Sequence, residues 1–156
     1  MLISLIRRYR YIKALDRLIF PREPITIKIV WKGRKPTGYW NVQRGKLTKE
    51  WYEIVIITKT GNDFNEAVHE VRHRIQCHYP KMPLFTKNKL IEMQRRNPQQ
   101  VIQKAIDDLE AIEKKEQEPL PEWEEDAIIV AKIVEQKCRS LRNPLEIAGE
   151  WIKKTP

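Results

Sequence analysis

The sequence contains few cysteines and no long hydrophobic run, and both features exclude whole classes of protein. Its 156 residues include only two cysteines, Cys77 and Cys138, which form no C-x-x-C pair. We therefore expect two reduced, partly buried thiols and no disulfide framework. No apolar run approaches the roughly 20 residues that span a bilayer. The short apolar stretch at residues 1–6 precedes its positive charges, unlike a signal peptide. These absences predict a cytoplasmic protein without a transmembrane segment.

The length and composition indicate one folded domain. Hydrophobic residues make up 41% of the chain and charged residues 33%, which is typical of a globular protein with a real core. We find no internal repeat and no low-complexity segment. The sequence therefore predicts a single domain over residues 1–156, in which a mixed first part (1–79) is followed by a helical second part (80–156).

The formal net charge of +9 raises the question of an anionic partner. The lysines and arginines are scattered along the chain, and we find no arginine-rich tract or basic-aromatic RNA signature. We interpret the charge as a solvated surface, and nucleic acid is the less favoured alternative partner. The sequence gives no indication of the oligomeric state.

The N-terminal third predicts one helix and a small sheet. Residues 2–20 have helical hydrophobic spacing with a basic outer face, and we expect this helix to pack against a sheet rather than lie on a membrane. Residues 25–31, 39–43 and 51–59 read as strands, and their short connections favour antiparallel pairing of neighbours. The predicted fold class is therefore α+β, with a three-stranded, mostly antiparallel sheet.

Helical periodicity dominates the rest of the chain. A helix is predicted from residue 63 to the Tyr79-Pro80 break, with an apolar stripe that we expect to pack on the sheet: Phe64, Val68, Val71 and Ile75. Further helices are predicted at residues 90–95, after Pro98 to residue 112, from Pro121 to about residue 141, and over residues 144–153.

The first of these helices carries the motif His69-Glu70-x-x-His73, the H-E-x-x-H pattern of a zinc site with a general base. Two residues four apart on a helix differ by about 40° of rotation, so both imidazoles can reach one ion. All three histidines of the chain lie between positions 69 and 78. The two motif histidines fall on the side of the helix opposite the apolar stripe. These observations predict a zinc centre in which Glu70 acts as the general base.

Catalytic zinc usually has three protein ligands and a water, so a third ligand must follow His73. An extension of the motif along the same segment is excluded, because positions 76 and 79 are Gln76 and Tyr79. His78 is displaced by one residue from the position that the extension requires. The third ligand must therefore come from another element.

A glutamate on a later helix meets this requirement. Glu124 opens the helix predicted after Pro121, and the small residues Ala127 and Ala131 follow at i+3 and i+7. We expect these alanines to let this helix approach the motif helix closely. Glu125 lies about 100° further round the helix and is the fallback ligand.

The two motifs, His69-Glu70-x-x-His73 and Glu124-x-x-Ala127, resemble those of the gluzincin class of zinc metallopeptidases. In size and order of elements the chain is most similar to minigluzincins and to the metallopeptidase-like domains of the ImmA/IrrE group. The similarity covers roughly residues 1–140 in organisation, and only the two motifs carry it in residues. The sequence departs from the class at Ile128, where a polar residue often orients a metal-binding histidine.

The resemblance implies a minimal zincin-like fold and zinc-dependent hydrolysis of peptide bonds, as an endopeptidase rather than an exopeptidase. It implies that His69, His73 and Glu124 bind zinc and that Glu70 takes a proton from the attacking water. The strand at residues 51–59 would then pair with an extended peptide or protein substrate. Tyr79 is a weak candidate for stabilising the oxyanion, and a packed thiol is favoured over a ligand role for Cys77.

Two other interpretations of the same residues stay open. In the first, the protein binds zinc but is catalytically silent, and its basic surface binds nucleic acid or a regulatory partner. In the second, the peptidase is held inactive by its own C-terminal helix, with Trp151 as the candidate plug.

Overall fold

Six helices account for most of the residues that the computed structural model describes, which are 2–22, 26–29, 39–40, 53–56, 63–138 and 144–156. The predicted helices are confirmed with small changes at their ends. Their bounds are α1 Leu2–Ile19, α2 Asp63–His78, α3 Lys87–Arg96, α4 Gln100–Glu116, α5 Glu122–Cys138 and α6 Pro144–Ile152. Residues 139–141, which we expected at the end of α5, lie outside the described residues.

Three short strands form a sheet whose topology differs from the prediction. They are β1 (Thr26–Ile29), β2 (Tyr39–Trp40) and β3 (Glu53–Ile56), in the order β1-β3-β2. β3 pairs with β2 antiparallel as expected, but β1 pairs with β3 in parallel, in the register Thr26 opposite Glu53. The outer residues of the three predicted strands lie outside the described part of the chain. The expectation of a mostly antiparallel sheet is therefore wrong.

The predicted α+β class is also wrong, because the described structure is a helical assembly in which the strands are a minor element. The helices are 18, 16, 10, 17, 17 and 9 residues long, whereas the strands have four, two and four residues. Every buried hydrophobic residue that the structure describes lies on a helix, except Phe85 between α2 and α3. Helix–helix packing therefore forms the described core.

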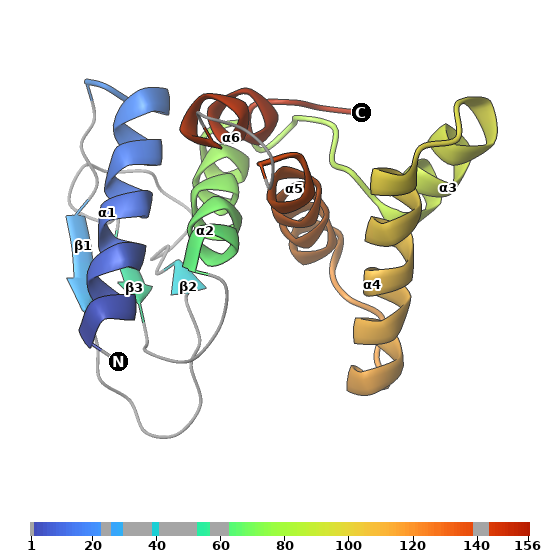
Figure 1. Ribbon diagram of the computed structural model, residues 1–156, viewed down its shortest axis with the longest axis horizontal. Helices are drawn as coiled ribbons and strands as arrows, with labels where there is room; N and C mark the ends of the chain where they lie inside the picture. Colours follow the sequence, from blue (N-terminus) through green and yellow to red (C-terminus); the bar gives the residue numbers. More distant parts are fainter. Residues whose placement is uncertain (1, 23–25, 30–38, 41–52, 57–62, 139–143) are drawn as a thin grey trace.

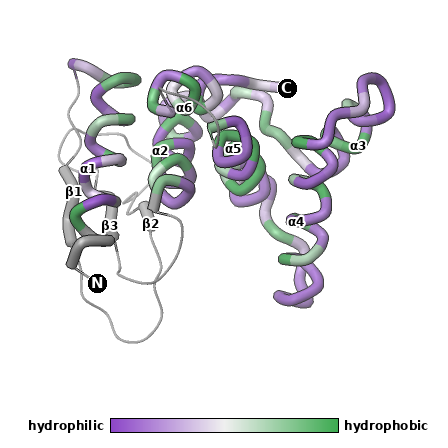
Figure 2. The backbone as a smooth tube through the Cα atoms, viewed as in Figure 1, coloured by the Kyte–Doolittle hydropathy of each residue, from purple (hydrophilic) through white to green (hydrophobic). Residues whose placement is uncertain are grey.

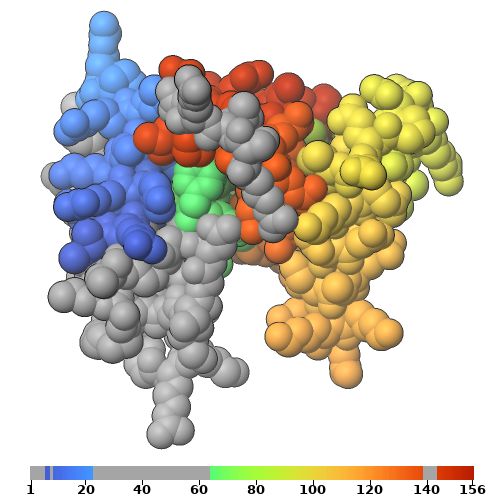
Figure 3. All heavy atoms as spheres, in the orientation of Figure 1, coloured from blue at the N-terminus to red at the C-terminus, as the bar shows by residue number. Residues whose placement is uncertain are grey.

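Helix α2 lies at the centre of this assembly, between α1 and α5 (Figure 1). Its most extensive contacts are with these two helices, and it also contacts β2, so packing on the sheet, which we predicted for its apolar stripe, is only a small part of the packing of α2. Val68, Val71 and Ile75 are nevertheless buried as expected. In the space-filling view only a narrow green patch of α2 is visible between α1 and the orange-red α5 and α6 (Figure 3).

The contact between α1 and α2 includes a buried ion pair. Ile12 and Leu15 of α1 join the core, and next to them the Arg74 guanidinium of α2 donates to the carboxylate of Asp16. Arg74 also stacks over the ring of Phe20, 4.2 Å from its centroid. Helix α1 therefore packs chiefly on a helix rather than on the sheet. Within the described residues, no helix combines the length and apolar character needed to cross a membrane.

Helix α5 is buried along most of its length and connects α2 to the rest of the helical part. It contacts α2, α4 and α6, and α3 lies beyond it against α4 (Figure 1). Figure 2 shows hydrophobic stretches on α5 and α6, whereas α3 is mostly hydrophilic. The start of α5 is therefore held against α2 by packing on several sides, and this is where the predicted third ligand lies.

Candidate metal centre

The side chains of His69, His73 and Glu124 converge between α2 and the first turn of α5. The two imidazole Nε2 atoms are 3.0 Å apart. Glu124 Oε1 lies 2.9 Å from His69 Nε2, and Oε2 lies 3.3 Å from His73 Nε2. Among the described residues these three form a group that could hold a metal ion, with all ligand atoms within 4.8 Å of one another.

The spacing of these atoms fits a tetrahedral zinc ion. Two ligand atoms that each lie about 2.0–2.1 Å from zinc, at the tetrahedral angle, are about 3.3 Å apart. The two histidine nitrogens are 3.0 Å apart, and each lies 2.9 or 3.3 Å from a different oxygen of Glu124, so each of these separations is close to the edge length although no single Glu124 oxygen makes both contacts. Two imidazole nitrogens and one carboxylate are also a donor set that zinc accepts, so the residues fit the ion with small movements.

Two features of the helices bring these side chains together. His69 and His73 are four residues apart on α2, and their rings meet edge to face with centroids 4.6 Å apart. Glu124 lies in the first turn of α5, where a carboxylate is also stabilised by the helix dipole. Ala127 and Ala131 are fully buried, as expected for small residues at the close approach of α5 to α2.

The charges in the cluster stabilise one another. Burial alone would lower the pKa of His69, but its hydrogen bond to Glu124 and the nearby carboxylates of Glu70 and Glu66 raise it above the usual value. Burial would likewise raise the pKa of Glu124, but the hydrogen bond from His69 and the nearby His73 ring hold it well below the usual range. When a metal ion binds beside Glu124, a protonated His69 ring releases its proton, and the ion replaces that proton as the positive charge next to the carboxylate.

Glu70 lies on α2 between the two histidines in sequence, and its side chain is almost completely buried, with 4% exposed. Burial raises the pKa of Glu70 to about 7, although the neighbouring His69 and His73 act in the opposite direction. A carboxyl group with a pKa near neutrality can accept and return a proton at physiological pH. Glu70 thus has the protonation behaviour that a general base requires.

The structure separates the two candidate glutamates. Only Glu124 is directed at the histidines. The Glu125 carboxylate instead accepts a hydrogen bond from the backbone N–H of Lys87, the first residue of α3. This contact satisfies one of the free N–H groups at the start of α3, so Glu125 has a structural role.

Sequence reasoning missed three residues near the cluster: Gln76 and Trp123, which lie against His73, and Asp126, which contacts Gln76. Gln76 Oε1 lies 2.9 Å from His73 Nδ1, and Gln76 Nε2 lies 2.6 Å from Asp126 Oδ2. The Trp123 ring lies 5.3 Å from the His73 ring. A glutamine three residues after the second histidine shares its helix face, and this spacing was the available signal for Gln76. Asp126 and Trp123 gave no such signal, because they reach the site only through packing of α5 on α2.

The other side chains weighed near the motif do not join the cluster. The His78 ring stacks on Phe20 with centroids 4.4 Å apart. The Tyr79 side chain is exposed, and no described contact links it to the cluster. Cys77 is outside the metal-competent group of described residues, and burial raises the pKa of its thiol. This agrees with a packed thiol rather than a ligand.

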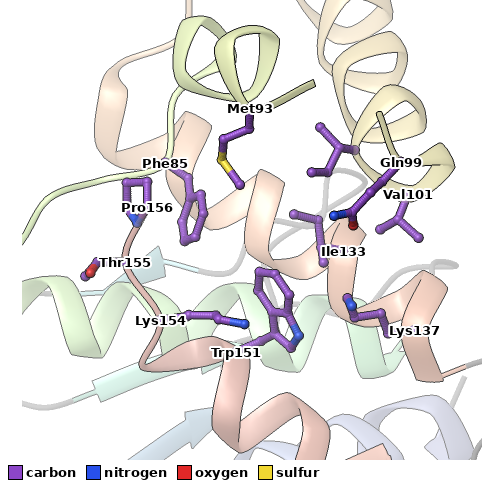
Figure 4. A pocket seen from close by; sticks show the side chains of 11 residues that line it. Phe85, Met93, Gln99, Val101, Ile133, Lys137, Trp151, Lys154, Thr155 and Pro156 are labelled. Carbon is purple, nitrogen blue, oxygen red and sulfur yellow. The ribbon is translucent and has the colours of Figure 1, made fainter. Parts of the chain in front are cut away.

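A separate pocket of about 270 Å³ lies around Trp151 (Figure 4). The α5 residues that line it, Ile133 and Lys137, lie in the second half of the helix, whereas Glu124 lies in its first turn. The walls of the pocket are mainly apolar and include Phe85, Met93 and Ile133, and its lining contains none of the cluster residues. Lys154 lies over the Trp151 ring, 4.1 Å from the centroid. The structure therefore places the Trp151 side chain in this pocket and not over the histidines. Inhibition by the C-terminal helix stays a prediction.

No protein-family model, no curated protein and no solved structure matches this chain. The functional assignment therefore rests on the geometry and chemistry of the described residues.

Proposed function

We propose that this protein is a zinc-dependent metallopeptidase that hydrolyses peptide bonds. The observation that carries the proposal is the convergence of His69, His73 and Glu124 at separations that match a zinc coordination sphere. Two further properties support catalysis rather than a purely structural ion. Three protein ligands leave one coordination position open. The Glu124 side chain is also 25% exposed and that of His69 15% exposed, so solvent reaches the cluster.

In this proposal, zinc held by the three ligands supplies Lewis acidity, which polarises a scissile carbonyl and acidifies a water. Glu70 is the general base that takes the proton of the attacking water. As the water adds, the new C–O bond forms and the carbonyl electron pair moves onto its oxygen. The same carboxyl group then gives the proton to the amine nitrogen, the peptide C–N bond breaks and the carbonyl re-forms as a carboxyl group. The burial that raises the pKa of Glu70 makes its carboxylate a stronger base toward the attacking water.

The order of the strands changes the proposed route of the substrate. β3 pairs on both sides, with β1 and with β2, so its backbone cannot add another strand. The expectation that β3 forms the cleft edge is therefore wrong. β2 is the edge strand that contacts α2 (Figure 1). We propose that an extended peptide substrate pairs with β2.

The two adjacent glutamates of α5 offer a matched test of the ligand set. We expect Glu124→Gln to weaken zinc binding by more than about 100-fold, because loss of a ligand should exceed the 10–100-fold cost of losing an outer partner. Glu125→Gln should bind zinc like the wild type, because its amide can still accept from Lys87. Competition with a chromophoric chelator measures both affinities. Equal affinity of Glu124→Gln and the wild type would contradict the ligand assignment.

The interpretation as a catalytically silent zinc protein predicts a different pattern. Such a protein would bind zinc through the same three residues, but the wild type and Glu70→Gln would be equally inactive on a library of quenched fluorescent peptides. Its binding to a DNA or RNA duplex would fall steeply with salt concentration. The metallopeptidase proposal instead expects cleavage that depends on both zinc and Glu70.

A further inference from the structure

Gln76 makes three polar contacts that together fix the direction of its side-chain amide. Its Nε2 lies 2.8 Å from the carbonyl oxygen of Trp123 and 2.6 Å from Asp126 Oδ2. A carbonyl oxygen and a carboxylate oxygen only accept hydrogen bonds, so both must face the NH₂ group of the amide. The oxygen of the same amide, Oε1, is therefore the atom directed at His73 Nδ1, at 2.9 Å.

The direction of this amide determines which ring nitrogen of His73 carries the proton. Gln76 Oε1 is an acceptor only, so His73 Nδ1 must be protonated to form the 2.9 Å hydrogen bond. A neutral imidazole with a protonated Nδ1 has its lone pair on Nε2. His73 Nε2 is the atom that lies 3.0 Å from His69 Nε2 and 3.3 Å from Glu124 Oε2. The lone pair of His73 therefore points to the place where the three ligand atoms meet.

Asp126 holds the glutamine in turn and is itself fixed. It is completely buried, and its carboxylate accepts two hydrogen bonds from Arg72, of 2.7 and 2.8 Å. The backbone N–H of Phe85 donates to Asp126 Oδ1 at 2.7 Å. A carboxylate with this many donors cannot turn away from Gln76 without losing several of them. The chain of contacts thus runs from Arg72 through Asp126 and Gln76 to His73.

We propose that Gln76 is a positioning residue for the metal centre, which sets the tautomer and ring orientation of His73 through the Asp126-held amide. This inference rests on the proposed function, because the role that it gives Gln76 is to orient a histidine that binds zinc. Outer partners of this kind orient a metal-binding histidine and increase its basicity. The side chain of Ile128 is apolar and cannot form a hydrogen bond with a histidine. In this protein the hydrogen bond to His73 comes from Gln76, on the same helix α2.

The test is the tautomer of His73 in zinc-free protein, read from the ¹⁵N shifts of its ring by NMR. The neutral His73 ring should carry its proton on Nδ1, which faces Gln76 Oε1. A spectrum of His73→Ala assigns the signals. A wild-type His73 protonated on Nε2 would overturn the inference, whether or not the protein binds zinc.

Gln76→Leu removes the acceptor while keeping a side chain of similar size. We expect its His73 to lose the preference for a protonated Nδ1, and its zinc affinity to fall by about 10–100-fold. The matched control is Gln136→Leu at the far end of α5, where the buried Nε2 has no hydrogen-bond partner among the described residues. This control should keep both the wild-type tautomer and the wild-type affinity.

The outcomes separate this inference from the proposed function. A Gln76→Leu protein with an unchanged tautomer and unchanged zinc affinity would show that Gln76 only bridges α2 and α5, which would overturn the inference. A wild type that shows the Nδ1 proton but binds no zinc would refute the proposed function while leaving the assigned contact intact. If Gln76→Leu does not fold, the wild-type tautomer alone decides the inference.

Discussion

Replacing Glu70 with glutamine is expected to lower the rate of peptide hydrolysis by about 10²–10⁴-fold, which is the usual contribution of a positioned general base. Glutamine has nearly the same shape as glutamate, but it cannot take a proton from the attacking water. Zinc binding should be retained, because Glu70 is not one of the three converging ligands. The measurement is kcat/KM on a cleavable peptide with zinc-loaded protein.

The same substitution is expected to stabilise the zinc-free protein at high pH. The pKa of Glu70 is raised from its ordinary 4.5 to about 7 in the folded state. As pH rises from 4.5 to 7, the unfolded chain releases this proton but the folded protein retains it, so the wild type loses stability. The loss approaches about 3 kcal/mol and stays constant above pH 7. The amide of the Glu70→Gln variant has no proton to lose, so the variant should avoid this loss.

Urea unfolding after removal of metal, at about pH 4 and pH 8, measures this difference. The stability of Glu70→Gln relative to the wild type should be higher at pH 8 than at pH 4, by up to about 3 kcal/mol. Glu92→Gln is the control, since Glu92 lies exposed on α3 beside Arg96, where ion pairs contribute little. A Glu70→Gln protein whose stability relative to the wild type is no higher at pH 8 than at pH 4 would contradict the described environment of Glu70.

Removing the Asp126 carboxylate is expected to cause the largest loss of stability. Asp126 and Arg72 are both fully buried, and Asp126→Ala leaves the guanidinium without its charge partner. Breaking such a buried pair from one side costs about 3–5 kcal/mol, a large part of the 5–15 kcal/mol that stabilises a typical domain. The cost is not local, because Arg72 also donates to the carbonyl oxygens of Ile152 and Lys154 near the C-terminus.

Asp108→Ala is the matched control for this experiment. Asp108 Oδ2 lies 3.9 Å from Lys132 Nζ, but about a third of each side chain is exposed. The loss of unfolding free energy in Asp108→Ala should therefore stay below about 1 kcal/mol. Urea denaturation with the midpoint and slope fitted separately compares the two variants. A loss in Asp126→Ala no larger than that in Asp108→Ala would show that the pair does not hold α2 and α5 together.

The positions of the helices could be predicted from local patterns, because hydrophobic spacing and proline breaks act within one element. The sheet could not, because its order depends on a pairing between distant segments. The short connection between β2 and β3 correctly predicted that these strands are neighbours. The parallel pairing of β1 with β3 was not predicted, because the hydrophobic pattern of the residues between them does not indicate it. The fold class was predicted wrongly because a short strand counts as much as a helix in a sequence pattern, whereas the described strands have only four, two and four residues.

The candidate ligands could be predicted because each lies in a short motif with a chemical purpose. His69 and His73 follow from their spacing, and Glu124 from its place at a helix start followed by small residues. The second layer around the site could not be predicted. Gln76 and Asp126 are 50 residues apart, and their contact exists only because α5 packs on α2. Gln76 even counted against a longer motif, although the structure places it against His73.

The most direct test of the central claim is X-ray absorption at the zinc edge of the zinc-loaded wild type. The account predicts one zinc ion per chain with about four nitrogen or oxygen neighbours at about 2.0–2.1 Å, and the outer scattering of two imidazole rings. Glu124→Gln should change this coordination sphere, and Glu125→Gln should leave it unchanged. A sulfur neighbour at about 2.3 Å, or a protein that takes up no zinc, would contradict the site formed by His69, His73 and Glu124.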